Sequence, residues 1–179
     1  MDDNINVDPL DHIDCYFNLS EFLIHFPGNA HKPIDAPYYV INNIILYHLI
    51  PLNRVREIFG EPVLISDHSG YRPVSWEINK NRNGSSTHTF GTNALPKEPT
   101  PMMAAGASDT TVRNMSRFTE FATLLARTPY RRHIIYPEKK FVHNDYKAEK
   151  KHFLVSEGNS LRHIRFEEYL EYADQIAND

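Results

Sequence analysis

Apolar residues recur at steps of three and four between Tyr38 and Phe59, a pattern that predicts a long helix with one buried face. Gly60 follows directly and provides a C-terminal stop. Pro51 lies inside the pattern and should kink or split the helix, because proline has no N–H to donate to the carbonyl four residues back. His48 falls on the apolar face, so a core histidine is favoured over a metal ligand.

Two further helices and four short strands follow from the same kind of reasoning. Helical spacing returns from Thr111 to Arg127, with Asp109 or Thr110 as its cap, and again from Phe166 to Ala177. Short apolar runs predict strands at residues 62–66, 133–137, 141–143 and 152–155. A charged turn, Glu138-Lys139-Lys140, should join the second and third of these strands as a hairpin.

The remaining segments are polar or rich in proline. Residues 1–18 are expected to form a polar arm, followed by a short helix over residues 21–25 that Ser20 would cap. Residues 92–105 contain three prolines and are expected to form a surface flap rather than a helix or a central strand. Helices beside adjacent short strands predict a single α+β domain with a small antiparallel sheet and flanking helices.

Composition excludes several classes of protein. The chain has 179 residues, enough for one domain with a real core, and its formal net charge is −4, whereas a nucleic-acid-binding surface needs a basic excess. No apolar run is long enough to span a membrane. The N-terminus lacks the features of a signal peptide, so we expect synthesis in a cytoplasm. The single cysteine, Cys15, excludes an intrachain disulfide and a multi-cysteine zinc site.

Three residues next to strand-like or turn-like sequence are candidate metal ligands: His88, Asp109 and His143. A catalytic zinc ion commonly has three protein ligands drawn from His, Asp and Glu, plus an open position for water. The spacing by itself leaves a second interpretation open, in which the two histidines make ordinary hydrogen bonds in a loop and a strand.

A set of short motifs occurs in a fixed order along the chain. They are Leu19-Ser20-Glu21-Phe22-Leu23, the Pro51-Leu52 pair in the long helix, Ser69-Gly70-Tyr71-Arg72, Ser86-x-His88-x-x-Gly91, Ala107-x-Asp109 and Phe141-Val142-His143-x-Asp145-Tyr146. This order resembles the M15 family of zinc peptidases, in particular the D-Ala-D-Ala carboxypeptidase-like branch of phages and bacteria. The resemblance covers residues 19–156. It implies a domain over residues 19–179 that is similar to the hedgehog/DD-peptidase fold.

The resemblance also implies roles for individual residues. His88, Asp109 and His143 would hold Zn²⁺, and Ser86 and Tyr71 would contact the substrate. Arg72 would bind the substrate carbonyl and the oxyanion that develops from it, since a guanidinium is always charged and donates in a fork. The alternative for Arg72 is a surface ion pair.

The chain departs from the family pattern in two ways. Fourteen residues separate Gly91 from Gly106, so Asp109 can reach the metal only if the insert loops out and returns. Lys140 occupies the position of the usual acidic general base, and lysine is a poor base unless its pKa is strongly depressed. Asp145 is the substitute candidate, with Glu138 behind it. Asp145 could instead orient a ligand histidine or a neighbouring arginine.

Two functions remain open at this point. The first is a zinc-dependent peptidase that hydrolyses amide bonds in peptidoglycan peptides, acting in phage lysis, in a virion or in a bacterium. The second is a catalytically inactive M15-like module that serves as a structural or binding component of a phage virion. The lysine in place of an acid at position 140, the long insert and the acidic N-terminal arm favour the second function. The retained ligand set and Ser86 favour the first.

Overall fold

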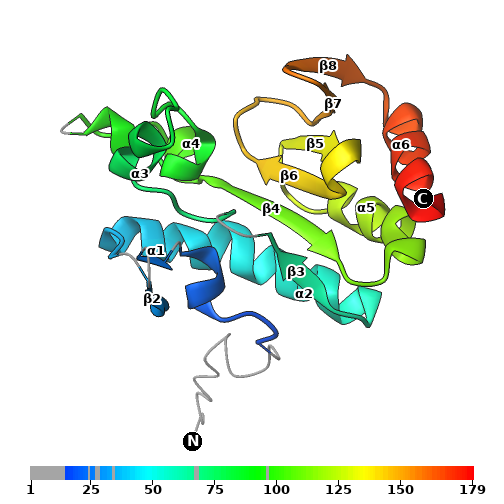
Figure 1. The fold of residues 1–179 in the computed structure, drawn as a ribbon, viewed down its shortest axis with the longest axis horizontal. Helices are drawn as coiled ribbons and strands as arrows, with labels where there is room; N and C mark the ends of the chain where they lie inside the picture. The colour runs from blue at the N-terminus through cyan, green and yellow to red at the C-terminus, as the bar shows by residue number, and fades with distance from the viewer. Residues whose placement is uncertain (1–14, 24, 27–28, 34, 67–68, 96) are drawn as a thin grey trace, which may run out of the picture.

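A six-stranded sheet forms the centre of the fold. The structure, a computed structural model, describes residues 15–23, 25–26, 29–33, 35–66, 69–95 and 97–179. The strands are β3 (Val63–Ile65), β4 (Ala107–Val112), β5 (Arg132–Tyr136), β6 (Phe141–Asp145), β7 (His152–Glu157) and β8 (Ser160–Ile164). They lie in the order β3-β4-β6-β5-β7-β8, and helices flank them in a mixed α/β domain (Figure 1).

The prediction of an antiparallel sheet is wrong at one pair. β5 and β7 run parallel, while the other neighbouring strands are antiparallel, so the sheet is mixed. Residues 146–151 carry the chain from the end of β6 across to the far side of β5. The β5–β6 hairpin and the β7 strand were predicted correctly. β8 was not predicted, because almost all of its side chains are exposed and it lacks an apolar alternation.

The long N-terminal helix is continuous but changes its winding in the middle. It consists of α1 (Tyr38–Ile44), a π-helical turn η2 (Ile45–Leu49) and α2 (Ile50–Phe59). The π turn ends at Leu49, two residues before Pro51, and accommodates the missing N–H donor. The helix therefore changes its winding near the proline but is not split. Gly60 ends the helix in the left-handed region, with φ of 74°, and its N–H donates to Arg56 O at 3.0 Å.

The helix predicted to begin at Thr111 begins later. Residues 107–112 form β4, and the helix is α5 (Phe118–Ala126), preceded by the 3-10 turn η5 (Met115–Arg117). Asp109 and Thr110 are therefore strand residues and not helix caps. The run Thr110-Thr111-Val112 is β-branched and pairs with β3 on one side, while β6 covers the other. The C-terminal helix α6 (Phe166–Asn178) agrees with the prediction.

The N-terminal part differs from the expected short helix. Residues Leu19–Phe22 form the 3-10 turn η1, and Leu23 is already extended and bridges to Tyr71. The strands β1 (His25–Phe26) and β2 (Asn29–Pro33) then make a small second sheet. Phe17 is buried, with its ring 6.1 Å from that of Phe22, so the end of the expected arm packs onto the domain. Residues 1–14 of that arm lie outside the described residues.

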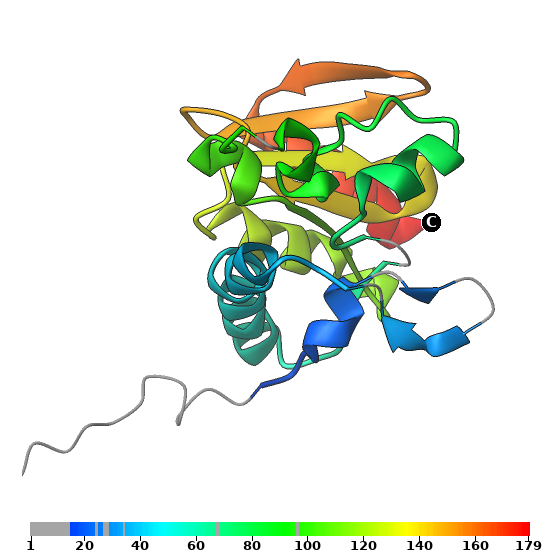
Figure 2. The ribbon, with the colours of Figure 1, turned by 90° about the vertical axis from the view of Figure 1, so that its left-hand side faces the viewer.

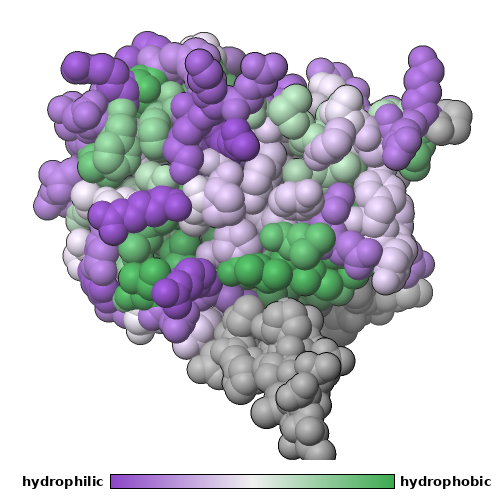
Figure 3. All heavy atoms as spheres, turned by 180° about the vertical axis from the view of Figure 1, so that it is seen from behind, coloured by the Kyte–Doolittle hydropathy of each residue, from purple (hydrophilic) through white to green (hydrophobic). Residues whose placement is uncertain are grey.

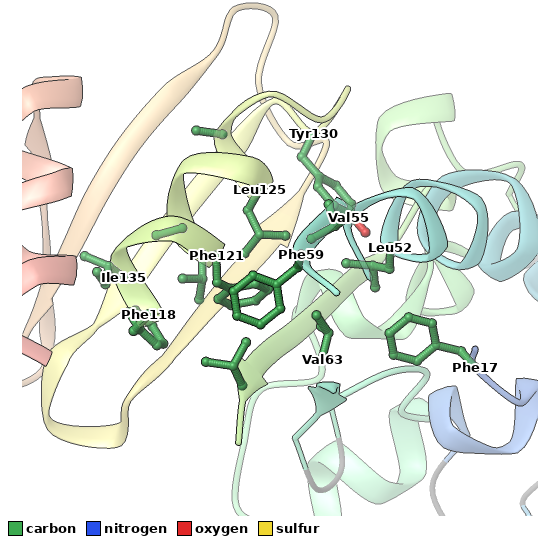
Figure 4. Close-up of a cluster of buried hydrophobic side chains, with 14 of the residues drawn as sticks. Phe17, Leu52, Val55, Phe59, Val63, Phe118, Phe121, Leu125, Tyr130 and Ile135 are labelled. Carbon is green, nitrogen blue, oxygen red and sulfur yellow. The ribbon is translucent and has the colours of Figure 1, made fainter. Parts of the chain in front are cut away.

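The main core lies between helices and the first strands of the large sheet. Phe59 of α2 and Phe121 of α5 meet with their ring centroids 6.0 Å apart, and the cluster extends to Val63 and Ile135 (Figure 4). α1, α2 and the small sheet lie at one side of the domain, away from the β7–β8 edge (Figure 2). The N-terminal part of β4, which follows the short helix α4 (Pro101–Ala104), carries the buried polar residues Ser108, Asp109 and Thr110.

The face of the molecule opposite to that of Figure 1 carries both polar and apolar side chains (Figure 3). On this face, apolar side chains gather in separate patches with hydrophilic residues between them (Figure 3). Among the described residues, no helix combines the length and the apolar character needed to cross a membrane.

Candidate metal centre

The three predicted ligands converge at one point. Asp109 of β4 and His143 of β6 are direct cross-strand partners in the register of the sheet. His88 comes from the 3-10 turn η3 (Thr87–Thr89), whose position is fixed by a hydrogen bond from Arg72 N to His88 O of 2.8 Å. All three side chains are buried, and together they could hold a metal ion.

The distances between the ligand atoms suit a small tetrahedral cation. His88 Nε2 lies 3.2 Å from His143 Nδ1 and 3.3 Å from Asp109 Oδ1, and the third distance, from His143 Nδ1 to Asp109 Oδ1, is 2.7 Å. Ligands at about 2.0–2.1 Å from a tetrahedral zinc ion are about 3.3 Å apart. Two of the three distances between ligand atoms therefore match a zinc site. The third, from His143 Nδ1 to Asp109 Oδ1, would have to lengthen when a zinc ion binds.

Each histidine has an acceptor behind it that fixes which ring nitrogen faces the centre. His88 Nδ1 lies 3.0 Å from the carbonyl oxygen of Gly70, and His143 Nε2 lies 2.8 Å from Asp145 Oδ2. If these nitrogens donate, the lone pairs of His88 Nε2 and His143 Nδ1 point at the centre. Ligand histidines in metalloproteins usually have such a partner, which sets the tautomer and the orientation of the ring.

The electrostatics of the cluster favour a positive charge at its centre. Burial alone would lower the pKa of His143, but the carboxylates of Asp109 and Asp145 outweigh it and raise that pKa to about 9. Burial lowers the pKa of His88. Asp109 is held well below its usual pKa by the two imidazoles, in spite of its burial. A metal cation binding at His143 Nδ1 would compete with the proton on that atom.

The second oxygen of Asp109 is held by neighbouring side chains. Oδ2 accepts hydrogen bonds from Ser69 Oγ at 3.2 Å and from Arg72 Nη2 at 3.3 Å, which leaves Oδ1 directed at the histidines. Arg72 Nη1 also donates to Glu77 Oε1 at 3.3 Å. Arg72 thus forms ion pairs with Asp109 and Glu77, as the alternative expected, but it does so in a buried position and not at the surface. Its guanidinium lies directly beside a ligand of the centre.

Asp145 lies on the far side of His143 from Asp109. It is fully buried, and its oxygens accept hydrogen bonds from Arg132 Nε at 3.0 and 3.1 Å, from Arg132 Nη2 at 2.5 Å and from Lys147 N at 2.9 Å. A general base must reach the proton that it removes. The geometry disagrees with a base role for Asp145 and agrees with the alternative, in which it orients His143.

Glu138 is also poorly placed for a base. It is exposed in the 3-10 turn η6 (Pro137–Lys139) that connects β5 to β6. Within the described part of the chain, no contact joins its side chain to the three ligands. Lys140 follows this turn in a left-handed conformation, with φ of 54°.

The two predicted substrate contacts differ in their position. Ser86 is partly exposed and caps η3, where its Oγ accepts a hydrogen bond from His88 N at 3.3 Å. Tyr71 is buried, and its ring contacts that of Phe90 with centroids 6.1 Å apart. Tyr71 is thus a core residue, and the prediction that it contacts a substrate disagrees with this burial.

The proline-rich insert loops out and returns, as the position of Asp109 requires. It contains the 3-10 turn η4 (Thr92–Ala94) and the short helix α4, so the expectation that it forms no helix is wrong. Pro101 occupies the first turn of α4, where an N–H is not needed, and Thr100 caps it. The return is at Gly106, where a Cβ atom would lie 2.3 Å from the ring of Phe90.

Several residues of the centre were missed in the sequence. Arg132 is the partner of Asp145, Glu77 pairs with Arg72, and the carbonyl of Gly70 orients His88. One of them had a weak signal: Arg132 and Asp145 carry opposite charges just outside the two strands of the predicted hairpin, and they face each other in the observed register. His48, in contrast, is confirmed as a core histidine, with Nε2 2.8 Å from Ala105 O and Nδ1 3.1 Å from Ser108 Oγ.

The centre therefore offers two imidazoles and one carboxylate from a turn and two neighbouring strands. A divalent cation held by this set keeps a net positive charge, which is the condition for activating water or polarising a carbonyl. No protein-family model, curated protein or solved structure matches the chain.

Proposed function

We propose that the chain is a zinc-dependent peptidase of the M15 type, which hydrolyses amide bonds in peptidoglycan peptides as a phage lysis or virion-associated enzyme. The observation that carries the proposal is the convergence of His88 Nε2, His143 Nδ1 and Asp109 Oδ1, with separations of 2.7–3.3 Å. The ordered motifs around these residues supply the substrate class. A fold similar to that of hedgehog and the DD-peptidases is part of the same proposal.

Zinc is the cation that suits this donor set best. Mg²⁺ and Ca²⁺ prefer sites built from oxygen atoms, and sites for Cu(I) or iron–sulfur clusters need thiolates or thioethers. Two imidazoles with one carboxylate are a common set at catalytic zinc sites, with one position left for water or substrate. All three donor side chains are buried.

The protein's own residues would hold the metal ion, orient its ligands and stabilise the negative charge that develops on the substrate. When bound, a zinc ion would lower the pKa of a bound water and polarise the scissile carbonyl. Asp145, held by Arg132, keeps His143 in the orientation that presents Nδ1. Arg72 adds a fixed positive charge beside Asp109 that would stabilise an oxyanion on the substrate.

A second candidate function is a metal-binding M15-like module without catalytic activity, serving as a structural or binding component of a virion. It is favoured by the positions of Asp145 and Glu138, the two candidates for the general base. Asp145 is occupied by Arg132 and His143, and Glu138 is exposed in a turn. Both candidates bind zinc, and only the peptidase releases peptide products.

Metal analysis and digestion of peptidoglycan by the same preparations test the proposal. We expect one zinc ion per chain and release of peptide fragments by the wild type, with both lost in His88→Ala. His163→Ala is a matched control, because His163 is an exposed histidine of β8. Circular dichroism of each variant checks folding. A zinc-loaded but inactive wild type favours the second candidate, and a wild type without zinc overturns both.

A further inference from the structure

A cavity of about 280 Å³ lies beside the metal centre. Its walls come from the η3 segment, the insert and the segment that follows β6, and they consist of Ser85, Ser86, Thr87, Thr89, Gly91, Asn93, Met103 and Lys147. Two of these residues contact the ligands directly. Ser86 Oγ accepts from His88 N, and Thr87 Oγ1 lies 3.4 Å from His143 Nε2. A molecule in the cavity would therefore lie one side chain away from the centre.

Five of the eight lining residues have hydroxyl or amide groups. The hydroxyls of Ser85 and Thr89 already donate within the protein, to Asn83 Oδ1 and to Ser86 O and Asn93 Oδ1. Lys147 is an exposed residue and the sole charged one among those that line the cavity. None of the carboxylates in the described residues forms an ion pair with its ammonium group, although several pair with nearby arginines. The backbone of Lys147 is tied to the centre, because its N–H donates to Asp145 Oδ1 at 2.9 Å.

We propose that this cavity is a carboxylate-binding subsite, in which the Lys147 ammonium pairs with a carboxylate of the substrate. The ammonium would make a charge-assisted hydrogen bond, which is stronger than a neutral one. Ser86 Oγ accepts from His88 N, so its own O–H can donate to the same carboxylate. The cavity is smaller than the roughly 300–1,000 Å³ of typical small-molecule sites. It suits one small residue that bears the carboxylate. The identity of this ligand as a substrate rests on the proposed peptidase function, whereas binding needs no turnover.

Two sources of the carboxylate are chemically possible, and the ligands of the experiment separate them. N-acetyl-alanine presents a terminal carboxylate, N-acetyl-glutamic acid α-amide presents only a side-chain carboxylate, and N-acetyl-alaninamide presents none. Each is titrated into wild-type protein by NMR, first after chelator treatment and then with zinc. The metal-free arm removes direct ligation of the carboxylate to zinc as an explanation.

The variants identify the residue responsible. We expect Lys147→Met to weaken binding of the preferred carboxylate at least tenfold without changing binding of N-acetyl-alaninamide, and Lys147→Arg to restore most of it. Lys150→Met is the matched control, because Lys150 is exposed nearby and does not line the cavity. Equal binding of all three ligands by the wild type, or an unchanged affinity in Lys147→Met, overturns the inference.

Hydrolysis is measured separately, so the two proposals fail in different ways. Lys147-dependent binding without release of peptide from peptidoglycan supports the subsite and contradicts the peptidase. Hydrolysis that is equally fast in wild type and Lys147→Met, on substrates with and without the carboxylate, supports the peptidase and removes the subsite.

Discussion

Asp145 Oδ2 lies 2.8 Å from His143 Nε2, two residues away on the same face of β6. The ring nitrogen that it contacts is the one directed away from Asp109 and His88. A carboxylate in this position fixes the tautomer of a ligand histidine and raises its basicity. The strand thus supplies both a metal ligand and the group that orients it.

Asp145→Asn separates this orienting role from that of a general base. We expect the dissociation constant for zinc to rise by about 10- to 100-fold, because a neutral amide raises the basicity of His143 less than the carboxylate of Asp145 does. Competition with a chromophoric chelator measures the constant. Glu138→Gln is the control and should leave it unchanged, since Glu138 is exposed in the hairpin turn. A general base would show the reverse: unchanged zinc affinity and a fall in kcat.

Arg132→Ala should destabilise the domain. Asp145 is fully buried, and its charge is balanced by the fork of Arg132 from the facing strand. Removing one partner of a buried ion pair leaves the other charge uncompensated and costs about 3 kcal/mol or more. Urea unfolding with and without zinc measures the free energy of unfolding. Arg132→Lys should recover part of the loss.

Arg127→Ala is the matched control for Arg132. Arg127 is exposed after α5, and its removal should change the free energy of unfolding by no more than about 0.5 kcal/mol. If both arginine variants unfold with the same free energy as the wild type, the contact with Asp145 contributes nothing to stability.

The periodicity of apolar residues correctly predicted those helices and strands that bury a single face along their whole length. The helix from Tyr38 to Phe59 and its change of winding near Pro51 follow from one buried stripe and one missing N–H. β4 was mistaken for the start of a helix, because Val112 fits the apolar spacing that continues into α5. Its strand character is determined by pairing with β3 and β6, which are distant in the sequence.

The ligand set could be predicted, and its surroundings could not. His88, Asp109 and His143 stand in recognisable motifs, and the structure brings them together. The acceptor behind His88 is a backbone carbonyl, that of Gly70, which no residue type reveals. The choice between a base and an orienting role for Asp145 depended on where its carboxylate points, and strand alternation gives the face of a side chain but not its partners.

Gly106→Ala tests whether the tight return of the insert at Gly106 is needed to position Asp109 at the metal centre. Gly106 has φ of 76°, and a Cβ atom there would lie 2.3–2.4 Å from three atoms of the Phe90 ring. The left-handed conformation costs about 1–2 kcal/mol for alanine, and the displaced ring adds to this cost. We expect a loss of unfolding free energy above 2 kcal/mol, together with weaker zinc binding.

Gly158→Ala isolates the backbone part of that effect. Gly158 also has a positive φ, of 61°, but no atom lies within 4 Å of the added Cβ. It should cost only about 1–2 kcal/mol and leave the zinc affinity unchanged. Equal losses in the two variants would show that the contact between Gly106 and Phe90 does not matter.

His48→Gln should remove part of the acid sensitivity of the fold. Burial lowers the pKa of His48 to about 3, against the ordinary value of 6.5. Below pH 6.5 the unfolded chain gains a proton at this residue that the folded chain does not. The free energy of unfolding of the wild type therefore decreases as the pH is lowered. Between pH 7.5 and 5.0 this difference amounts to about 2 kcal/mol. Glutamine does not titrate, so urea unfolding of metal-free protein should show a variant that is relatively more stable at pH 5.0. The metal ligands titrate in both proteins and cancel in the comparison. Identical pH profiles of the two proteins would show that His48 is not the source of the loss of stability at acid pH.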